Sequence, residues 1–199
     1  MRLFIQANED QRSELGLVMV EHPNLTCSDF MPNAEQYEMY EAFFILDKNQ
    51  AEIDYACFEG KAVFINEVIL TLSDLNTVDN IYRINAWPTF LKRDTWEVAG
   101  KSNPIISEIF EELGKKPIFV KDLPGMVAAR VISMIINEAF YALNENVSTK
   151  EEIDLAMKLG TNYPYGPFEW AGKICLDHIY NLLLKLSQTD ERCIPAFKP

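Results

Sequence analysis

The sequence predicts an α/β first part followed by an all-α second part, that is, a mostly parallel sheet and then a helical bundle. Up to residue 120, short apolar runs alternate with polar segments of helical length. From residue 125 onward, apolar residues recur only at helical spacing. The chain has 199 residues, enough for two small domains. We therefore expect a domain at residues 1–120 and another at residues 121–199.

The first part contains apolar runs that predict about six buried strands. They lie at residues 1–7, 17–21, 42–46, 61–65, 81–84 and 117–120. Each run is bounded by polar residues, which is typical of strands buried on both faces of a parallel sheet. Parallel pairing requires crossover connections. We expect helices in these connections at residues 10–16, 34–40, 50–58 and 104–115.

The second part predicts a series of amphipathic helices. The first has an apolar face made of Val127, Val131, Met134, Ile135, Phe140 and Leu143. Glu151 follows Ser148 at the spacing of a capping box, which predicts that a second helix begins there and ends at Gly160. Its inward side is expected to consist of Ile153, Ala156, Met157 and Leu159. Residues 168–186 form the last helical region, with a break expected near Gly172.

Composition and charge exclude several classes of partner. The net charge of −12 argues against binding to nucleic acid or to an anionic membrane, because both need clustered cations. No apolar run reaches the ~18 residues of a membrane span, and the start of the chain lacks the long apolar stretch of a secretory signal, so we expect a cytoplasmic protein. The cysteines and histidines are too scattered for a zinc site, so no metal is expected: Cys27, Cys57, Cys175, Cys193, His22 and His178.

Five short motifs in the second part resemble one known family. Residues 121–130 read Lys-Asp-Leu-Pro-Gly-Met-Val-Ala-Ala-Arg, similar to the family pattern Asp-x-Pro-Gly-Phe-x-x-Asn-Arg. Residues 163–169 read Tyr-Pro-Tyr-Gly-Pro-Phe-Glu, against Tyr-Pro-Met-Gly-Pro-Phe-Glu. Residues 137–139, 153–160 and 176–177 match in the same order and spacing. The set resembles the helical C-terminal domain of the 3-hydroxyacyl-CoA dehydrogenase family.

The resemblance extends, more weakly, to a shortened Rossmann-like first domain. Residues 61–66 resemble the family strand that ends in Ser-Asn-Thr-Ser. Residues 80–98 resemble the segment Phe-x-Gly-x-His-Phe-Phe-Asn-Pro and the Val-Glu-Val strand after it. In this register Asn85 takes the place of the catalytic histidine and Glu97 that of the glutamate, at the family's spacing of 97 − 85 = 12. The matching substrate-cleft positions are near Asn66 and Val68, and at Ala129.

Most of the chemistry that the resemblance implies is missing. In the family a histidine takes the hydroxyl proton while hydride passes to NAD, a glutamate orients the histidine, and a serine and an asparagine hold the substrate oxygen. The amide of Asn85 cannot accept a proton near neutral pH. Glu67 and Val68 stand near the serine position, and Ala129 stands at the asparagine position. Glu97 is the one retained residue of the four.

The dinucleotide motif is also missing. A nicotinamide site of this class needs a Gly-x-Gly-x-x-Gly turn after the first strand, so that backbone N–H groups approach the pyrophosphate. Residues 8–14 read Asn-Glu-Asp-Gln-Arg-Ser-Glu, with no glycine and with three carboxylates. We therefore expect no cofactor.

Two functions remain open. The first is a catalytically degenerate relative, a pseudoenzyme, that acts in ligand binding or assembly, with an acyl-CoA-like ligand or a protein partner. The alternative is an oxidoreductase on 3-hydroxyacyl-CoA, in fatty-acid metabolism, that uses NAD through relocated catalytic residues. In both cases we expect a homodimer through the C-terminal helices, because the family carries its dimer contact there. The leucines at 182–184 also cover most of a helix circumference.

Overall fold

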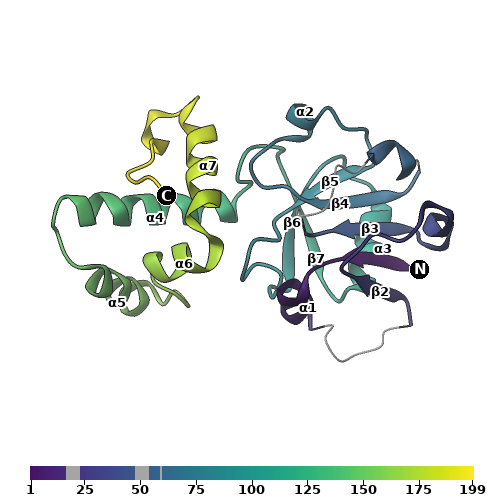
Figure 1. Cartoon of the computed structure of the whole chain (residues 1–199), viewed down its shortest axis with the longest axis horizontal. Helices are drawn as coiled ribbons and strands as arrows, with labels where there is room; N and C mark the ends of the chain where they lie inside the picture. Colours follow the sequence, from purple (N-terminus) through teal and green to yellow (C-terminus); the bar gives the residue numbers. More distant parts are fainter. Residues whose placement is uncertain (17–22, 48–53, 59) are drawn as a thin grey trace. The chain divides into compact units, whose positions relative to one another are not determined.

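The computed structural model describes residues 1–199 except 17–22, 48–53 and 59. The chain divides into two compact units, residues 1–126 and 127–199 (Figure 1), so the division falls six residues after the boundary expected from the sequence (126 − 120). We call them unit 1 and unit 2.

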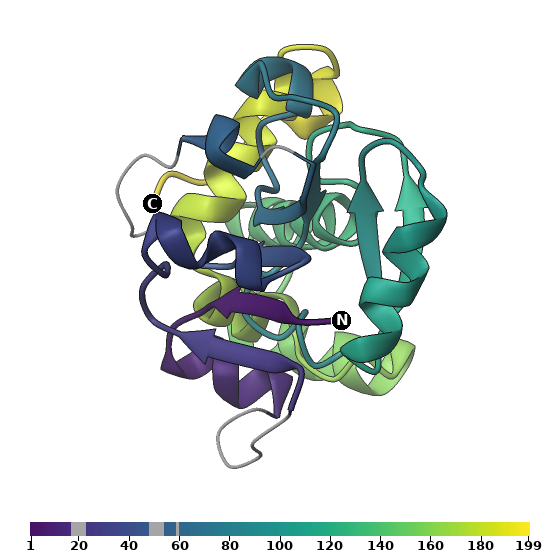
Figure 2. The ribbon, with the colours of Figure 1, turned by 90° about the vertical axis from the view of Figure 1, so that its right-hand side faces the viewer.

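Unit 1 is built on a seven-stranded sheet with the order β2-β1-β3-β4-β5-β6-β7. The strands are β1 (Leu3–Gln6), β2 (Leu25–Ser28), β3 (Ala42–Ile45), β4 (Ala62–Asn66), β5 (Ile81–Ile84), β6 (Thr95–Ala99) and β7 (Lys116–Val120). Only β5 and β6 pair antiparallel, so the predicted mostly parallel sheet is confirmed. Figure 2 shows β1 and β2 side by side.

The strand count differs from the expected six. The apolar runs predicted β1, β3, β4, β5 and β7, and the resemblance predicted β6. The run at residues 17–21 lies outside the described residues. β2 was missed because its sequence, Leu-Thr-Cys-Ser, is half polar and only half-buried at the edge of the sheet.

Aromatic side chains fill both faces of the sheet. All four residues of β3 are buried. On one face the rings of Phe44 and Phe64 stack with centroids 4.4 Å apart, and Phe110 meets both edge-on. On the other face the ring of Phe43 packs against that of Phe58 at 4.8 Å. Alternate side chains of one strand therefore enter two separate cores, as expected for a sheet covered on both sides.

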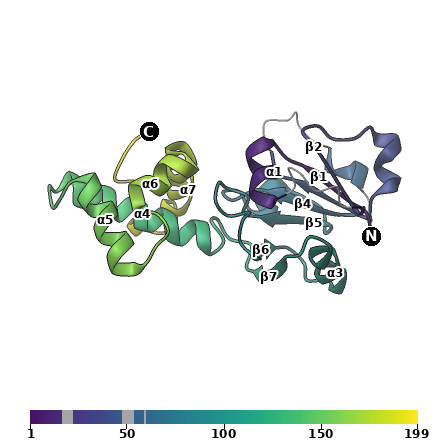
Figure 3. The ribbon, with the colours of Figure 1, turned by 90° about the horizontal axis from the view of Figure 1, so that it is seen from below.

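Short helices connect the strands of unit 1. They are α1 (Glu9–Leu15), α2 (Leu72–Leu75), α3 (Pro104–Glu112) and the 3-10 turns η1 (Ala34–Met39) and η2 (Tyr55–Phe58). α1, η1 and α3 lie where the sequence predicts crossover helices. The segment expected at residues 50–58 falls partly outside the described residues. Figure 3 shows α3 beside β7, which it covers.

Unit 2 consists of α4 (Ala128–Asn144), α5 (Lys150–Thr161), α6 (Pro167–Ile174), α7 (Leu176–Ser187) and the 3-10 turn η3 (Glu191–Cys193). The helical second part is thus confirmed. Within the described chain, no helix combines the length and apolar character needed to cross a bilayer.

The helix ends in unit 2 correct three expectations. Thr149, not Ser148, caps α5, and its capping box closes on Glu152 rather than Glu151. α5 ends in a left-handed residue at Asn162 instead of at Gly160. The break between α6 and α7 lies at Cys175, with φ 85°, rather than at Gly172.

The buried faces of α4 and α5 also differ from the predicted ones. α4 buries a face made of Ala129, Ile132, Ser133, Ile136, Asn137 and Ala139. Val127 and Val131 are 53% and 51% exposed. In α5 the buried residue is Asp154, while Ala156 and Leu159 are exposed. Apolar spacing alone did not reveal that polar side chains anchor both helices.

Candidate functional site

The carboxyl ends of the parallel strands form one edge of the sheet in unit 1. β1 lies between β2 and β3. The connection after β1 leads to β2 on one side, whereas the connection after β3 leads to β4 on the opposite side. Such a switch point is where open parallel sheets bind ligands. Gln6 ends β1 at this point, Asn66 ends β4, and Asn85 follows β5.

The buried side chain of Gln6 forms hydrogen bonds to two loops at the switch point. Its side chain is fully buried. Its Nε2 donates to the carbonyl of Asp29 at 2.9 Å, and its Oε1 accepts the N–H of Asp47 at 3.1 Å. Gln11 adds a bond from Nε2 to the carbonyl of Leu46 at 2.8 Å. The loops that follow β2 and β3 are therefore held by amide side chains at the place where a ligand would enter.

The start of α1 does not fit the pyrophosphate of a dinucleotide. Oδ1 of Asn8 accepts the N–H of Gln11 at 3.0 Å, and Oε1 of Gln11 accepts the N–H of Asn8 at 3.1 Å. This capping box uses N–H groups that would otherwise face an anion. Glu9 and Asp10 add negative charge in the first turn. Internal caps and repulsion together oppose a phosphate here.

Asn66 ties three strand ends together. Its Nδ2 donates to the carbonyl of Leu46 at 3.0 Å, and its Oδ1 accepts the N–H of Ala86 at 3.0 Å. Both ends of the amide are therefore occupied by main chain. This side chain, expected in a substrate cleft, positions the segments after β3 and β5.

The pairing of β5 with β6 ends beside the positions of Asn85 and Glu97. Ile84 lies opposite Val98 in this antiparallel pair. Asn85 follows Ile84 and Glu97 precedes Val98, so both positions adjoin the last residue pair of the two strands.

Asn85 places an amide, not a base, at this edge. Only 7% of its surface is exposed. Its Oδ1 accepts the N–H of Trp87 at 3.1 Å. Its Nδ2 is buried and, among the described residues, has no hydrogen-bond partner. An amide is not basic enough to take a proton from a substrate hydroxyl near neutral pH.

Arg83 is a site residue that the sequence reasoning missed. Its fully buried guanidinium donates to the carbonyls of Glu67 at 3.0 Å and Val68 at 3.1 Å, and it forms an ion pair with Asp122. In the family pattern Phe-x-Gly-x-His, Arg83 takes the place of the glycine. The available signal was a cation inside an apolar strand, since such a charge must be paired.

The arginine anchors the segment that leads out of unit 1. Oδ2 of Asp122 accepts the N–H of Leu72 at 2.9 Å. The N–H of Gly125 donates to the carbonyl of Val68 at 2.7 Å. Val68, expected near the substrate, is 1% exposed and contributes its carbonyl to this network. Ala129, the other expected cleft residue, is fully buried and belongs to α4 of unit 2.

The motif at residues 163–169 has a structural explanation in unit 2. The carboxylate of Asp154, on α5, accepts the N–H of Phe168 at 2.8 Å and that of Glu169 at 3.1 Å. It therefore caps α6 from outside the helix. A Cβ at Gly166 would lie 2.3 Å from the Asp154 carboxyl group, so glycine is required there.

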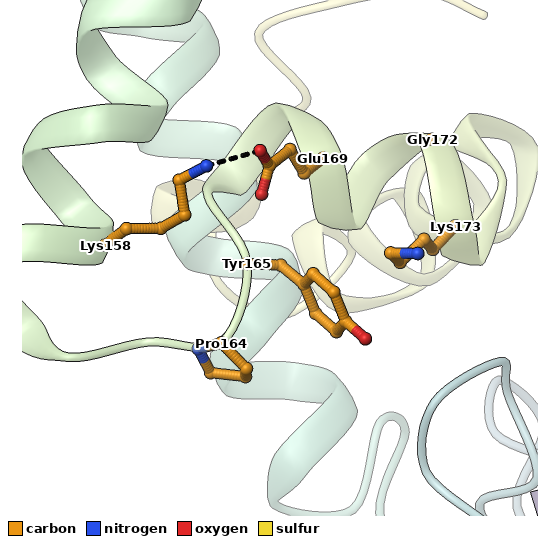
Figure 4. A pocket seen from close by; sticks show the side chains of 6 residues that line it. All are labelled: Lys158, Pro164, Tyr165, Glu169, Gly172 and Lys173. Carbon is orange, nitrogen blue, oxygen red and sulfur yellow. Dashed lines mark hydrogen bonds and ion pairs between the residues drawn. The ribbon is translucent and has the colours of Figure 1, made fainter.

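A shallow depression of about 590 Å³ lies beside this motif (Figure 4). Nζ of Lys173 lies 4.6 Å from the ring centroid of Tyr165. Lys158 forms an ion pair with Glu169, and the hydrogen bond from this lysine lowers the pKa of Glu169 below its ordinary value. The depression is lined by Lys158, Pro164, Tyr165, Glu169, Gly172 and Lys173.

Comparison with known proteins assigns unit 2. Residues 125–198 match the family model of the 3-hydroxyacyl-CoA dehydrogenase C-terminal domain. The match covers 74 of the 199 residues (198 − 125 + 1), so the similarity to this family is carried by unit 2. The chain is 43% identical over 76 residues to 3-hydroxyadipyl-CoA dehydrogenase of Escherichia coli, a stretch that covers 38% of this chain and 16% of that protein. It is 37% identical over 93 residues to a probable 3-hydroxybutyryl-CoA dehydrogenase of Deinococcus radiodurans, covering 47% of this chain and 34% of that protein.

Solved structures extend the likeness to the fold of the whole chain. The crystal structure of (S)-3-hydroxybutyryl-CoA dehydrogenase from Ralstonia eutropha aligns with a TM-score of 0.69 at 24% identity, over 87% of this chain and 68% of that one. The 3-hydroxybutyryl-CoA dehydrogenase of Escherichia coli K12 aligns with a TM-score of 0.69 at 15% identity, over 97% of this chain and 49% of that one. These neighbours combine a Rossmann domain with a helical domain. The curated relatives above are matched over no more than about a third of their length.

Proposed function

We propose that this chain is a 3-hydroxyacyl-CoA dehydrogenase-like protein that lacks dehydrogenase chemistry and acts in ligand binding or assembly. The observation that carries the proposal is the state of Asn85. In the resemblance it takes the place of the family's histidine, and an amide is not a base near neutral pH. Its oxygen accepts the N–H of Trp87. Loss of a general base typically reduces a rate by roughly 10²–10⁴-fold.

We also propose that the chain does not bind NAD, and the start of α1 supports this. Asn8 and Gln11 use the N–H groups of the first turn, and Glu9 and Asp10 repel phosphate. A protein without a dinucleotide site has no acceptor for the hydride. The missing base and the missing dinucleotide site therefore both support a protein without dehydrogenase activity.

The proposed ligand is acyl-CoA-like. The support is the family of unit 2, since its relatives are named for CoA thioesters with a 3-hydroxyacyl group. A cytoplasmic location is part of the proposal, and it agrees with the four free thiols of Cys27, Cys57, Cys175 and Cys193.

The proposed assembly is a homodimer through the helices of unit 2. Leu155 and Leu159, one turn apart on α5, are 54% and 78% exposed, and Val127 and Val131 form a second exposed pair on α4. The argument from residues 182–184 is weaker than the sequence suggested, because Leu182 and Leu183 are fully buried in the chain. The exposed pairs therefore carry the proposal.

An activity assay with a restored histidine tests the proposal. Purified protein should form no NADH from (S)-3-hydroxybutyryl-CoA, and the Asn85→His variant should gain little, because the dinucleotide site is unsuitable as well. Thermal-shift measurements run in parallel should show stabilisation by an acyl-CoA and none by NAD. Robust NADH formation by the unmodified protein would instead establish the alternative, an oxidoreductase with relocated catalytic residues.

A further inference from the structure

We propose that α4 carries a peptide-binding groove, which the chain fills with its own residues 190–197. We call these residues the strap. The groove recognises the backbone of an extended peptide with the pattern apolar–proline–small–aromatic, here residues 194–197. Figure 1 shows this last, yellow part of the chain returning to α4.

Asn137 forms the centre of the groove. Its side chain is almost fully buried. Its Nδ2 donates to the carbonyl of Ile194 at 2.8 Å, and its Oδ1 accepts the N–H of Ala196 at 2.8 Å. The amide of Asn137 thus binds two main-chain groups that are two residues apart. This recognises the extended conformation of the strap and not a particular side chain.

Two further side chains on α4 continue this contact. The hydroxyl of Tyr141 donates to the carbonyl of Ile194 at 3.1 Å, and Nδ2 of Asn144 donates to the carbonyl of Ala196 at 2.8 Å. Tyr141 comes four residues after Asn137, and Asn144 comes seven residues after it. All three therefore lie on one face of the helix. Four hydrogen bonds therefore reach two residues of the strap.

Proline fits the position between the two strap residues whose main chain receives these bonds. Pro195 has no N–H, and the bonds from α4 go to the residues before and after it. Ile194 has φ −58° and ψ 126°, the extended conformation that a following proline favours. Proline therefore restricts the peptide to the bound shape before it binds, as in other polyproline recognition sites.

An aromatic contact completes the groove. The ring of Phe197 stacks on Phe140 with centroids 4.3 Å apart, and Tyr180 of α7 meets it edge-on at 6.2 Å. Phe140 lies on α4 beside the polar residues that bind the backbone. The groove thus combines sequence-independent backbone binding with one pocket that selects an aromatic side chain.

These contacts need no covalent connection between the strap and α7, so the groove should bind the same peptide supplied separately. In the test, the full chain folds with a protease site inserted between Gln188 and Thr189 and is then cut. A labelled synthetic peptide of residues 190–199 should exchange into the cut protein and give saturable fluorescence anisotropy. Failure of the labelled peptide to exchange or to saturate would contradict the proposal.

Modified peptides distinguish backbone recognition from nonspecific apolar binding. N-methylation of Ala196 removes the donor that Asn137 accepts, and it should weaken binding at least about tenfold, because a buried acceptor loses its partner. A peptide with Phe197→Ala should also bind more weakly. Equal affinity of the N-methyl and unmodified peptides would overturn the proposal.

Protein variants supply a matched control. Asn137→Asp removes the donor to Ile194 and should weaken peptide binding, whereas Asn181→Asp, at an exposed position of α7, makes the same chemical change and should leave it unchanged. In the uncut protein, Asn137→Leu removes the acceptor of the Ala196 N–H and should speed hydrogen exchange at that amide. Unchanged exchange at Ala196 would contradict the proposal even if the cut protein were too unstable to assay.

Discussion

Arg83 is the residue whose environment departs furthest from what a buried strand normally contains. Its guanidinium is fully buried and pairs with Asp122, while its other donors reach main-chain carbonyls. Each of its three nitrogens thus has an acceptor, which is what keeping a charge inside a protein requires. The sequence could not show this, because the partner carboxylate lies 39 residues along the chain.

Loss of the arginine should therefore destabilise unit 1. We expect Arg83→Met to lower the free energy of unfolding by about 3 kcal/mol, since it removes the charge partner of Asp122 and the side-chain donor to the carbonyls of Glu67 and Val68. The matched control is the exposed pair of Lys101 and Asp79, where Lys101→Met should change stability little. Chemical denaturation of both variants measures the difference, and equal effects would show that Arg83 does not anchor the network.

Asp154 provides a second prediction at the scale of single residues. Asp154→Ala should cost on the order of 1–2 kcal/mol, because it uncaps the N–H groups of Phe168 and Glu169 at the start of α6. Glu151→Ala, in the exposed first turn of α5, is the control and should change stability little. Similar thermal shifts for the two variants would contradict the capping role.

At the same scale, the sequence predicted Asn85 and Glu97 as site residues, and their positions adjoin the last pair of β5 and β6. Their roles, and those of Asn66, Val68 and Ala129, stay predictions. Gln6 and Gln11 were not foreseen, because an amide that binds a distant loop leaves no local pattern in the sequence.

At the scale of elements, apolar runs predicted the strands well and the helix faces poorly. β1, β3, β4 and β5 are dominated by buried apolar side chains, so composition alone locates them. β7 has the same apolar composition at the edge of the sheet, where its residues are half-buried or exposed. α5 differs because its buried contact is the carboxylate of Asp154, which leaves Leu159 outside. Helical periodicity identifies a helix, but it does not reveal a polar residue that faces inward.

The exposed leucines of α5 lead to a prediction about assembly. If α5 contributes to the dimer, light scattering should give a mass near twice the chain's 22.9 kDa, and the double substitution Leu155→Glu with Leu159→Glu should return it to one chain mass. The same kind of change at two exposed apolar residues of unit 1, Phe30→Glu with Val78→Glu, should leave the dimer intact. A mass near 22.9 kDa for the unmodified protein would show that the dimer proposal is wrong.

At the scale of the whole molecule, the change in sequence pattern near residue 125 corresponds to the change from unit 1 to unit 2. Five motifs carried the resemblance of unit 2, because proline and glycine corners constrain sequence strongly. Unit 1 has a mostly parallel sheet, and Gln6, Asn8 and Gln11 form internal hydrogen bonds at its switch point. Our proposal that the chain binds no NAD rests on these bonds.

Calorimetric titration of the purified protein with NAD tests the central claim most directly. The internal caps of α1 and the carboxylates of Glu9, Asp10 and Glu14 predict no measurable heat of binding, and NADH should behave in the same way. A saturable isotherm with a dissociation constant in the micromolar range would contradict the account, because it would require a dinucleotide site that these residues oppose.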